Sequence, residues 1–295
     1  MNSLLRLIWL TTIPVLIYSV IKTPDLENMS YELGALHSAT GGFGSNQVAS
    51  VMGLGIFLSY YAWMNKLLFS GNHNLDGIFI AFFAYQGLLT FSRGGIIIAL
   101  CAIIVYYYYF RNSENFIKYV KKKSLRPLLF FGFALMGIFL SYIVIESRSD
   151  GYITLRYLGE TYGTISGDKI KTIDSFTTGR YSIVISDFKL WADNFIFGTG
   201  AGASKYARIG NLYGISPHTE ITRLLAEHGV FGFIFIVLLL IISLKSMNRN
   251  RNSIYYSIII TLFFIGLGTA LHSAMRTFIT PIMITLSMVQ IIDKE

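Results

Sequence analysis

The residue best placed to do chemistry in this sequence is a histidine in the stretch Ile215–Phe231, which reads ISPHTEITRLLAEHGVF. Ser216 can cap a helix, and Pro217 suits the first helical position because its missing N–H leaves no donor unpaired there. His218 would then lie in the first turn, where the positive end of the helix dipole disfavours the imidazolium. The stretch therefore predicts a neutral histidine that can act as a general base, on a helix that Gly229 ends or bends.

Two arginines lie where an anion could bind. Arg180 precedes an amphipathic stretch, Tyr181–Asp193, which predicts a helix on the membrane surface, and a guanidinium beside free helix amides suits a phosphate. Arg93 lies in the turn Phe91–Gly95 and is the only charge in the two apolar runs that flank it. The alternatives are a solvent-exposed arginine at a helix end and an interfacial arginine that snorkels to water.

The composition is that of a membrane protein with several spans. Of the 295 residues, 53% are hydrophobic and 14% are charged, and the mean hydropathy is +0.55, which is too apolar for an ordinary soluble domain. The single Cys101 excludes an intrachain disulfide and a cysteine metal cluster. We expect an all-α bundle of about eight transmembrane helices, over Leu4–Val20, Val48–Phe69, Gly77–Phe91, Gly95–Phe110, Leu128–Ile145, Val230–Leu244, Ile254–Leu271 and Phe278–Ile292.

Lysine and arginine gather in the loops Arg111–Arg126 and Lys245–Arg251, which the positive-inside rule assigns to the cytoplasm. With the N-terminus inside, the cytoplasmic segments hold 12 Lys/Arg and 4 Asp/Glu, so the whole formal charge of +8 is on that side. Both termini are then cytoplasmic, and the loop Glu146–Gly229 faces outward. The topology and the anionic lipid of the cytoplasmic leaflet account for the excess of Lys and Arg over Asp and Glu, so nucleic acid is not an expected partner.

The sequence divides into three parts on this topology. Residues 1–76 hold N-terminal transmembrane helices, residues 77–245 hold a central region that includes the extracytoplasmic loop 146–229, and residues 246–295 hold a C-terminal transmembrane hairpin. The loop is far longer than a connection needs, so we expect amphipathic helices and a function of its own within it.

Other motifs have plainer explanations. Gly198–Gly202 (GTGAG) looks like a nucleotide-binding loop but follows no buried strand, so we expect a turn. Glu220, Arg223 and Glu227 lie three and four residues apart, which predicts ion pairs along one helix face. Neither a metal nor a cofactor is expected, because no metal-ligand spacing links the remaining histidines, His37, His73, His228 and His272.

Five short elements follow one another along the chain: GFGSN at Gly42–Asn46, SRG at Ser92–Gly94, GR at Gly179–Arg180, NFIFGTG at Asn194–Gly200, and a histidine before LLAE and a glycine at His218–Gly229. Their order resembles the O-antigen ligase and O-antigen polymerase superfamily, which acts in the assembly of bacterial surface polysaccharides. The sequence departs from the family pattern in two places. Phe195 stands where the family has proline, and no arginine stands just before Gly41. The chain also offers fewer spans than most members.

The resemblance implies a metal-independent glycosyltransferase that uses an undecaprenyl-pyrophosphate-linked glycan as donor. Arg93 and Arg180 would bind the pyrophosphate and stabilise its charge as it leaves, and His218 would take the proton of the attacking hydroxyl. The chemistry of the compartment agrees with this expectation. An outward-facing site lacks ATP and nucleotide sugars, so a sugar transfer there needs a donor that is already activated.

The preferred function is a repeat-unit polymerase of the O-antigen or capsule type, in the bacterial cytoplasmic (inner) membrane with its active site facing outward. The alternative is an O-antigen ligase that transfers the glycan to lipid A core or another acceptor. A polysaccharide transporter or flippase is an alternative of a different class, but no charged residue lies mid-span in the seven spans after the first. Expected partners are the lipid-linked oligosaccharide donor and acceptor, the membrane, and other polysaccharide-assembly proteins.

Overall fold

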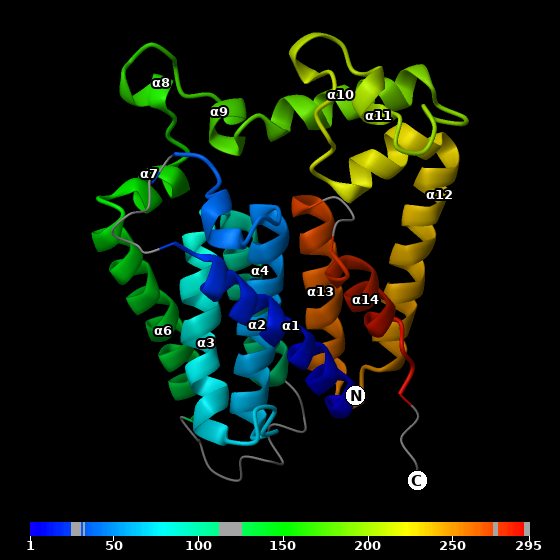
Figure 1. Ribbon diagram of the computed structural model, residues 1–295. Helices are drawn as coiled ribbons and strands as arrows, with labels where there is room; N and C mark the ends of the chain where they lie inside the picture. The colour runs from blue at the N-terminus through cyan, green and yellow to red at the C-terminus, as the bar shows by residue number, and fades with distance from the viewer. Residues whose placement is uncertain (25–30, 32, 112–125, 274–276, 292–295) are drawn as a thin grey trace.

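The computed structural model describes residues 1–24, 31, 33–111, 126–273 and 277–291. Every regular element in these ranges is a helix and no strand occurs in them, which confirms the all-α fold. Within the described part, eight helices form a bundle at the positions of the predicted spans (Figure 1). They are α1 (Asn2–Lys22), α2 (Ser45–Asn65), α3 (His73–Leu89), α4 (Arg93–Arg111), α6 (Arg126–Arg148), α12 (Glu220–Arg249), α13 (Tyr256–His272) and α14 (Ile279–Ser287).

Helix α2 is the centre of the bundle. It packs against α1, α3 and α4, and most of its length is buried. Two glycines permit this close packing. A Cβ on Gly53 would lie 2.3 Å from the Gly95 carbonyl oxygen of α4, and a Cβ on Gly55 would lie 2.5 Å from the Phe83 ring of α3. Small residues let transmembrane helices approach one another in this way, so protein contacts surround α2 on several sides.

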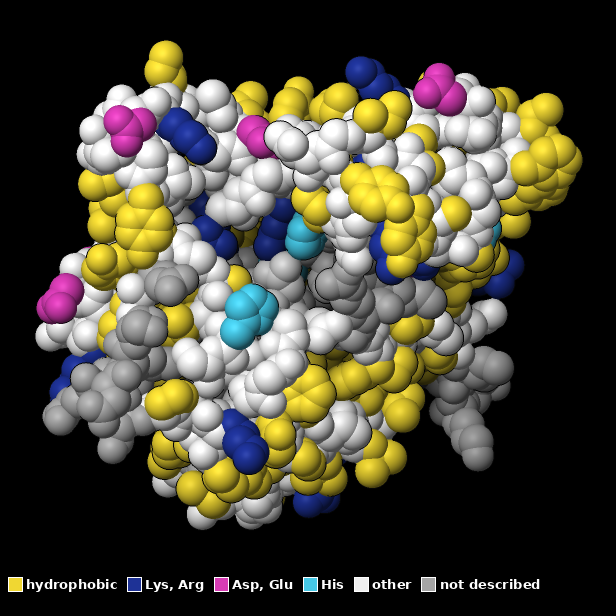
Figure 2. Space-filling view, turned by 45° about the horizontal axis from the view of Figure 1, so that its top comes forward, with side chains coloured by type: hydrophobic (Ala, Val, Ile, Leu, Met, Phe, Trp, Pro, Cys, Tyr) yellow, Lys and Arg dark blue, Asp and Glu magenta, His cyan; other side chains and the backbone are white. Residues whose placement is uncertain are grey.

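Four described helices are long and apolar enough to cross a membrane: α1, α4, α12 and the Leu128–Arg148 part of α6. Helix α13 is apolar but shorter. Large hydrophobic side chains are exposed on the outside of the bundle, such as Phe139 of α6 and Leu244 of α12, and Figure 2 shows hydrophobic side chains over much of its lower part. Exposed apolar surface of this extent fits contact with lipid, as expected for a polytopic membrane protein.

The last helix is shorter than predicted. We expected a span over Phe278–Ile292, but α14 ends at Ser287, and its 9 residues rise only about 14 Å, less than half of the roughly 30 Å hydrocarbon core. The chain leaves the helix because its backbone bonds to the end of α12 instead. The Asn250 side chain donates to the Val289 carbonyl (2.8 Å) and accepts from the Ile291 amide (3.0 Å).

The loop 146–229 folds over one end of the bundle and contains helices of its own, as predicted. They are α7 (Tyr152–Leu158), α8 (Tyr162–Ile165), α9 (Ile173–Thr177), α10 (Arg180–Asp193) and α11 (Ser204–Ala207). Figure 1 shows α8 to α11 lying across the top of the bundle, and the N-terminus at its opposite end. Most of the predicted basic loop, 112–125, and the predicted turn residues 274–276 lie outside the described residues.

Candidate functional site

The helix that follows His218 begins later than predicted. Helix α12 starts at Glu220, and Thr219 is its N-cap, because the Thr219 hydroxyl accepts from the Thr222 amide (3.2 Å). His218 therefore precedes the cap, and the prediction that it lies in the first helical turn is wrong. The later start is stabilised because the Thr222 hydroxyl also donates to the buried Asp187 carboxylate (2.7 Å). The helix dipole argument for a neutral His218 does not apply at this position.

A break in α12 shapes the same end of the molecule. Gly229 has φ 58° and ψ −133°, which is not helical and which a side chain would strain. The amides of Thr199 and Gly200 donate to the carbonyl oxygens of Ala226 (2.8 Å) and Glu227 (3.1 Å), one turn before the break. The bend predicted at Gly229 is confirmed. The glycine-rich segment after α10 is a turn that packs against this bend, as expected.

A buried ion pair connects α10 to the chain that leads to His218. Arg208 Nη2 lies 2.5 Å from Asp187 Oδ1, and both side chains are fully buried. Arg208 also donates to the Ile215 carbonyl, three residues before His218. Removing one partner of such a pair leaves an uncompensated buried charge. The pair therefore fixes α10 and the 208–215 segment relative to each other.

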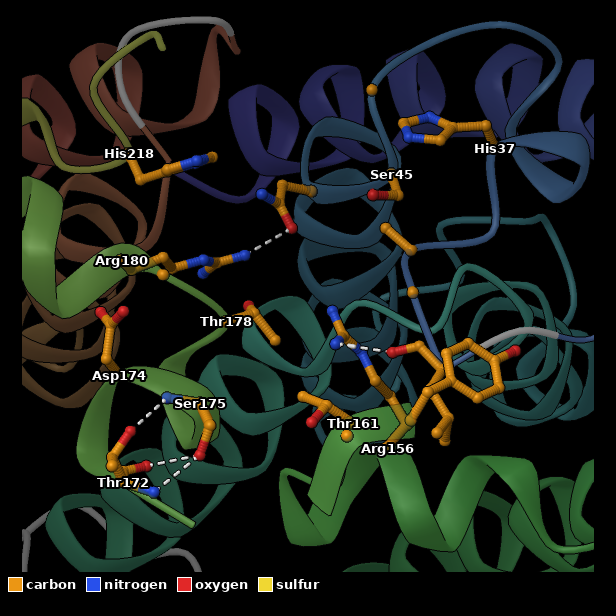
Figure 3. Close-up of a pocket in the computed structure, with 18 of the residues that line it drawn as sticks. His37, Ser45, Arg156, Thr161, Thr172, Asp174, Ser175, Thr178, Arg180 and His218 are labelled. Carbon is orange, nitrogen blue, oxygen red and sulfur yellow. Dashed lines mark hydrogen bonds between the residues drawn. The ribbon is translucent and has the colours of Figure 1, made fainter. Parts of the chain in front are cut away.

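A cavity of about 1170 Å³ opens between the bundle and the loop helices. Its walls come from the chain before α2, the start of α2, the segment from α7 to α9, the first residue of α10 and residues 217–218. Figure 2 shows this end hollowed, with Lys or Arg and His side chains gathered in it, and Figure 3 shows the lining side chains. The predicted Arg180 and His218 share this cavity, whereas Arg93 is not among its lining residues.

Arg180 is held by side chains from two membrane helices. Its Nη2 donates to Asn46 Oδ1 of α2 (3.0 Å), and its Nη1 lies 3.0 Å from His272 Nδ1 at the end of α13. A guanidinium can only donate, so Nδ1 accepts and the His272 ring is neutral. The Ser92 hydroxyl donates to the same Asn46 oxygen (2.7 Å). Burial and the charge of Arg93 lower the pKa of Arg180.

Arg93 begins α4 and contacts the loop helices. Its Nη2 donates to the Phe176 carbonyl (2.6 Å), its Nη1 to the Tyr157 carbonyl (3.4 Å), and its guanidinium lies 5.1 Å from the centre of the Phe176 ring. The glycine that follows serves packing, because a Cβ on Gly94 would lie 2.1 Å from the His272 ring. Arg93 therefore lies behind the cavity wall, close to the residues that hold Arg180.

Arg156 of α7 is a cavity residue that the sequence reasoning missed. It is only 7% exposed, and it donates from Nη1 to the Leu33 carbonyl (2.9 Å) and from Nε to the Phe91 carbonyl (3.4 Å). Burial, followed by the charges of Arg93 and Arg180, lowers the pKa of Arg156 to about 10. The available signal was a lone charge in an otherwise uncharged helix, YITLRYL.

The three arginines have no carboxylate partner in the part of the chain that the structure describes. The ion pairs found there are Lys171–Glu160, Arg208–Asp187, Arg223–Glu220 and Arg223–Glu227. The two pairs of Arg223 were predicted from their spacing and are confirmed. Arg93, Arg156 and Arg180 therefore make this end of the bundle cationic, which suits an anionic ligand. The described residues include no group of three or more His, Cys, Asp or Glu that could hold a metal ion.

These features define a polytopic helical membrane protein with a cationic cavity at one end of its bundle. The O-antigen ligase family model matches residues 78–237, more than half of the chain, and the chain belongs to this family. No curated protein matches the chain. The family match includes Arg93, Arg156, Arg180 and His218. It confirms the resemblance carried by the short motifs and indicates a glycosyltransferase-like enzyme of membrane glycan assembly.

Proposed function

We propose that this protein is a membrane glycosyltransferase that polymerises lipid-pyrophosphate-linked glycan repeat units on the outer side of the bacterial cytoplasmic membrane. The observation that carries the proposal is the shared cavity, which Arg180 and His218 both line. Figure 3 shows the two side chains near each other at one side of this cavity. A leaving diphosphate needs cationic donors, and an attacking hydroxyl needs a base, so the pair supplies the two functions that the transfer requires.

The reaction assigns a role to each predicted residue. Arg180 binds the pyrophosphate of an undecaprenyl-linked donor, Arg93 adds positive charge from behind the cavity wall, and His218 faces the acceptor hydroxyl. The acceptor oxygen bonds to the anomeric carbon while its proton passes to His218. The bond between that carbon and the diphosphate oxygen breaks, and the electron pair leaves with the diphosphate. The guanidinium groups stabilise this charge, so the scheme needs no divalent cation.

The geometry of Arg180 suits this role. Its contacts with Asn46 and His272 each use one N–H group, and a guanidinium has five. The remaining donors are available to an anion without loss of the two contacts that orient the side chain. Orientation before the ligand arrives is what makes electrostatic stabilisation effective, since no reorganisation is then needed in the transition state.

The size of the cavity suits two substrates. Pockets that hold one small ligand usually measure roughly 300 to 1,000 Å³, and this cavity measures about 1170 Å³. The diphosphate and first sugar of the donor would fill the part near Arg180. The remaining volume extends along α8 and α9, where Thr161, Tyr162 and Lys169 line the wall, and we assign it to the acceptor glycan.

An O-antigen ligase is the second candidate, and the family match is compatible with both reactions. Both reactions join the same kind of donor to a hydroxyl, and they differ in the acceptor. Deletion of the gene, followed by electrophoresis of the surface glycans, distinguishes them. A polymerase mutant loses the polymer but keeps single repeats on the normal acceptor, whereas a ligase mutant accumulates polymer on its lipid carrier.

A transporter or flippase would move the lipid-linked glycan without making a bond. The test is an assay with purified protein in detergent, a lipid-linked donor and its acceptor. A new glycosidic bond and released undecaprenyl pyrophosphate support the proposed transferase. Intact donor after long incubation with folded protein and both substrates would overturn it.

A further inference from the structure

We infer that Arg156 is a third guanidinium that binds an anionic group of the substrate in this cavity. The inference rests on the proposed function, because it assigns a further residue to the same site. Arg156 lines the cavity together with Arg180, and Figure 3 shows the two side chains entering it from different helices, with Thr178 between them.

The contacts of Arg156 leave part of its guanidinium available. Nη1 and Nε donate to the carbonyls of Leu33 and Phe91, and the guanidinium has three further N–H groups. Nη2 makes no hydrogen bond with any described residue. It is also absent from the side-chain atoms that are both fully buried and unpaired, so part of its surface is exposed. Nη2 of Arg156 is therefore accessible from the cavity.

The electrostatic surroundings of Arg156 favour an anion. The side chain is buried, its protein partners are neutral carbonyls, and the charges of Arg93 and Arg180 lower its pKa. Its pKa of about 10 still leaves it protonated at neutral pH. A buried charge is costly unless it is paired, and a phosphate or carboxylate in the cavity would supply the partner.

A purely structural role explains less. The two carbonyl contacts connect α7 with the chain before α2 and with the turn before α4. They do not account for the position of the guanidinium on the cavity wall. Arg208 shows what a structural arginine in this loop looks like, because it is fully buried against the Asp187 carboxylate.

The anionic group can come from two sources, the diphosphate of the donor or an acidic sugar of the glycan. Two probes separate these sources: undecaprenyl pyrophosphate without a sugar, and the complete lipid-linked repeat unit. Binding of each probe is measured by titration of the purified full-length protein in detergent. The variants are Arg156→Gln, Arg156→Lys, Arg180→Gln and Arg249→Gln, where Arg249 is exposed at the far end of α12.

We expect Arg156→Gln to weaken binding of the sugar-free probe roughly 10- to 100-fold, the loss of one or more charge-assisted hydrogen bonds. Arg156→Lys keeps the charge and should lose less, and Arg249→Gln should bind normally. If Arg156→Gln weakens only the complete repeat unit, the anion is an acidic sugar. Either result supports the inference.

Normal binding of both probes by Arg156→Gln, while Arg180→Gln binds weakly, would overturn the inference and leave the proposed function standing. Normal binding by Arg180→Gln as well would instead contradict the proposed function. Because Arg156 also connects three segments, each variant must first elute as a single species and unfold cooperatively. If Arg156→Gln fails this requirement, Arg156→Lys decides: binding equal to the wild type overturns the inference, and a several-fold loss supports it.

Discussion

An isosteric change at Asn46 separates a ligand-binding role of Arg180 from a structural one. Asn46 Oδ1 lies 3.0 Å from Arg180 Nη2 and also accepts from the Ser92 hydroxyl. Asn46→Asp keeps the shape and both of these contacts but introduces a carboxylate next to Arg180. Among the described residues, Arg180 has no such partner in the wild type. The adjacent guanidinium favours the ionised form of the new carboxylate.

The size of the effect follows from this geometry. Two unit charges about 4 Å apart interact with roughly 4 kcal/mol at an effective dielectric constant of about 20. Solvent in the cavity reduces this value, so we take about 3 kcal/mol. A substrate diphosphate must compete with the new carboxylate for the same guanidinium, so kcat/KM for the donor should fall ~100-fold. The new ion pair should at the same time raise the unfolding temperature of the free protein.

Initial rates of transfer over a range of donor concentrations, with thermal unfolding in the same detergent, measure both effects. Asn46→Ala removes the acceptor without adding a charge and should cost only ~10-fold. Asn248→Asp adds the same charge at an exposed position near the far end of α12 and should change neither quantity. Wild-type kcat/KM in a folded Asn46→Asp protein would refute the claim that Arg180 binds the donor.

Three further predictions test the site and its orientation. Arg93→Lys and Arg180→Lys should each lose about 3 kcal/mol of transition-state stabilisation, ~100-fold in rate, because an ammonium lacks the two-pronged geometry with which Arg180 meets the diphosphate and Arg93 holds the Phe176 and Tyr157 carbonyls; full activity of both lysine variants would favour interfacial snorkelling. His218→Ala should leave donor binding intact and slow transfer by roughly 100- to 10,000-fold, and high activity of the alanine or glutamine variant at matched protein levels would remove His218 from the chemistry. A phosphatase fused after Gly210 should be active and one fused after Lys122 inactive, and the reverse pattern would invert the topology and every site assignment.

Features set by local residue patterns could be predicted from the sequence. The apolar runs located the bundle helices, and the amphipathic run Tyr181–Asp193 located α10 to within one residue. Gly229 was identified as a bend because glycine readily adopts a positive φ, and the structure has φ 58° there. In both cases the deciding information lies within a few residues of the feature.

The start of α12 shows where local rules stop. Ser216 before Pro217 is an acceptable N-cap, and so is Thr219, so capping preferences alone permit two starts. The structure selects Thr219, because the Thr222 hydroxyl of the first turn reaches the Asp187 carboxylate of α10. The error placed His218 inside the helix, whereas the structure leaves it before the N-cap. It arose from a contact between residues that are 35 positions apart.

The partners of Arg180 illustrate the same limit within the site. Asn46 and His272 lie 134 and 92 positions from Arg180 in the sequence. Helical and strand periodicities relate residues only a few positions apart, so no spacing rule connects these three. The short motifs identified Arg180 as a candidate, but its orientation depends on how the ends of α2 and α13 meet α10.

Two buried arginines of the same loop show what the structure adds to a count of charges. A buried guanidinium must find a carboxylate, other hydrogen-bond acceptors or an anionic ligand, and the sequence does not say which one it finds. Arg208 meets the Asp187 carboxylate and is sealed from solvent. Arg156 meets only backbone carbonyls of the described chain and lies on the cavity wall. The charge of Arg208 is therefore balanced within the fold, whereas the charge of Arg156 is balanced only when an anion enters the cavity.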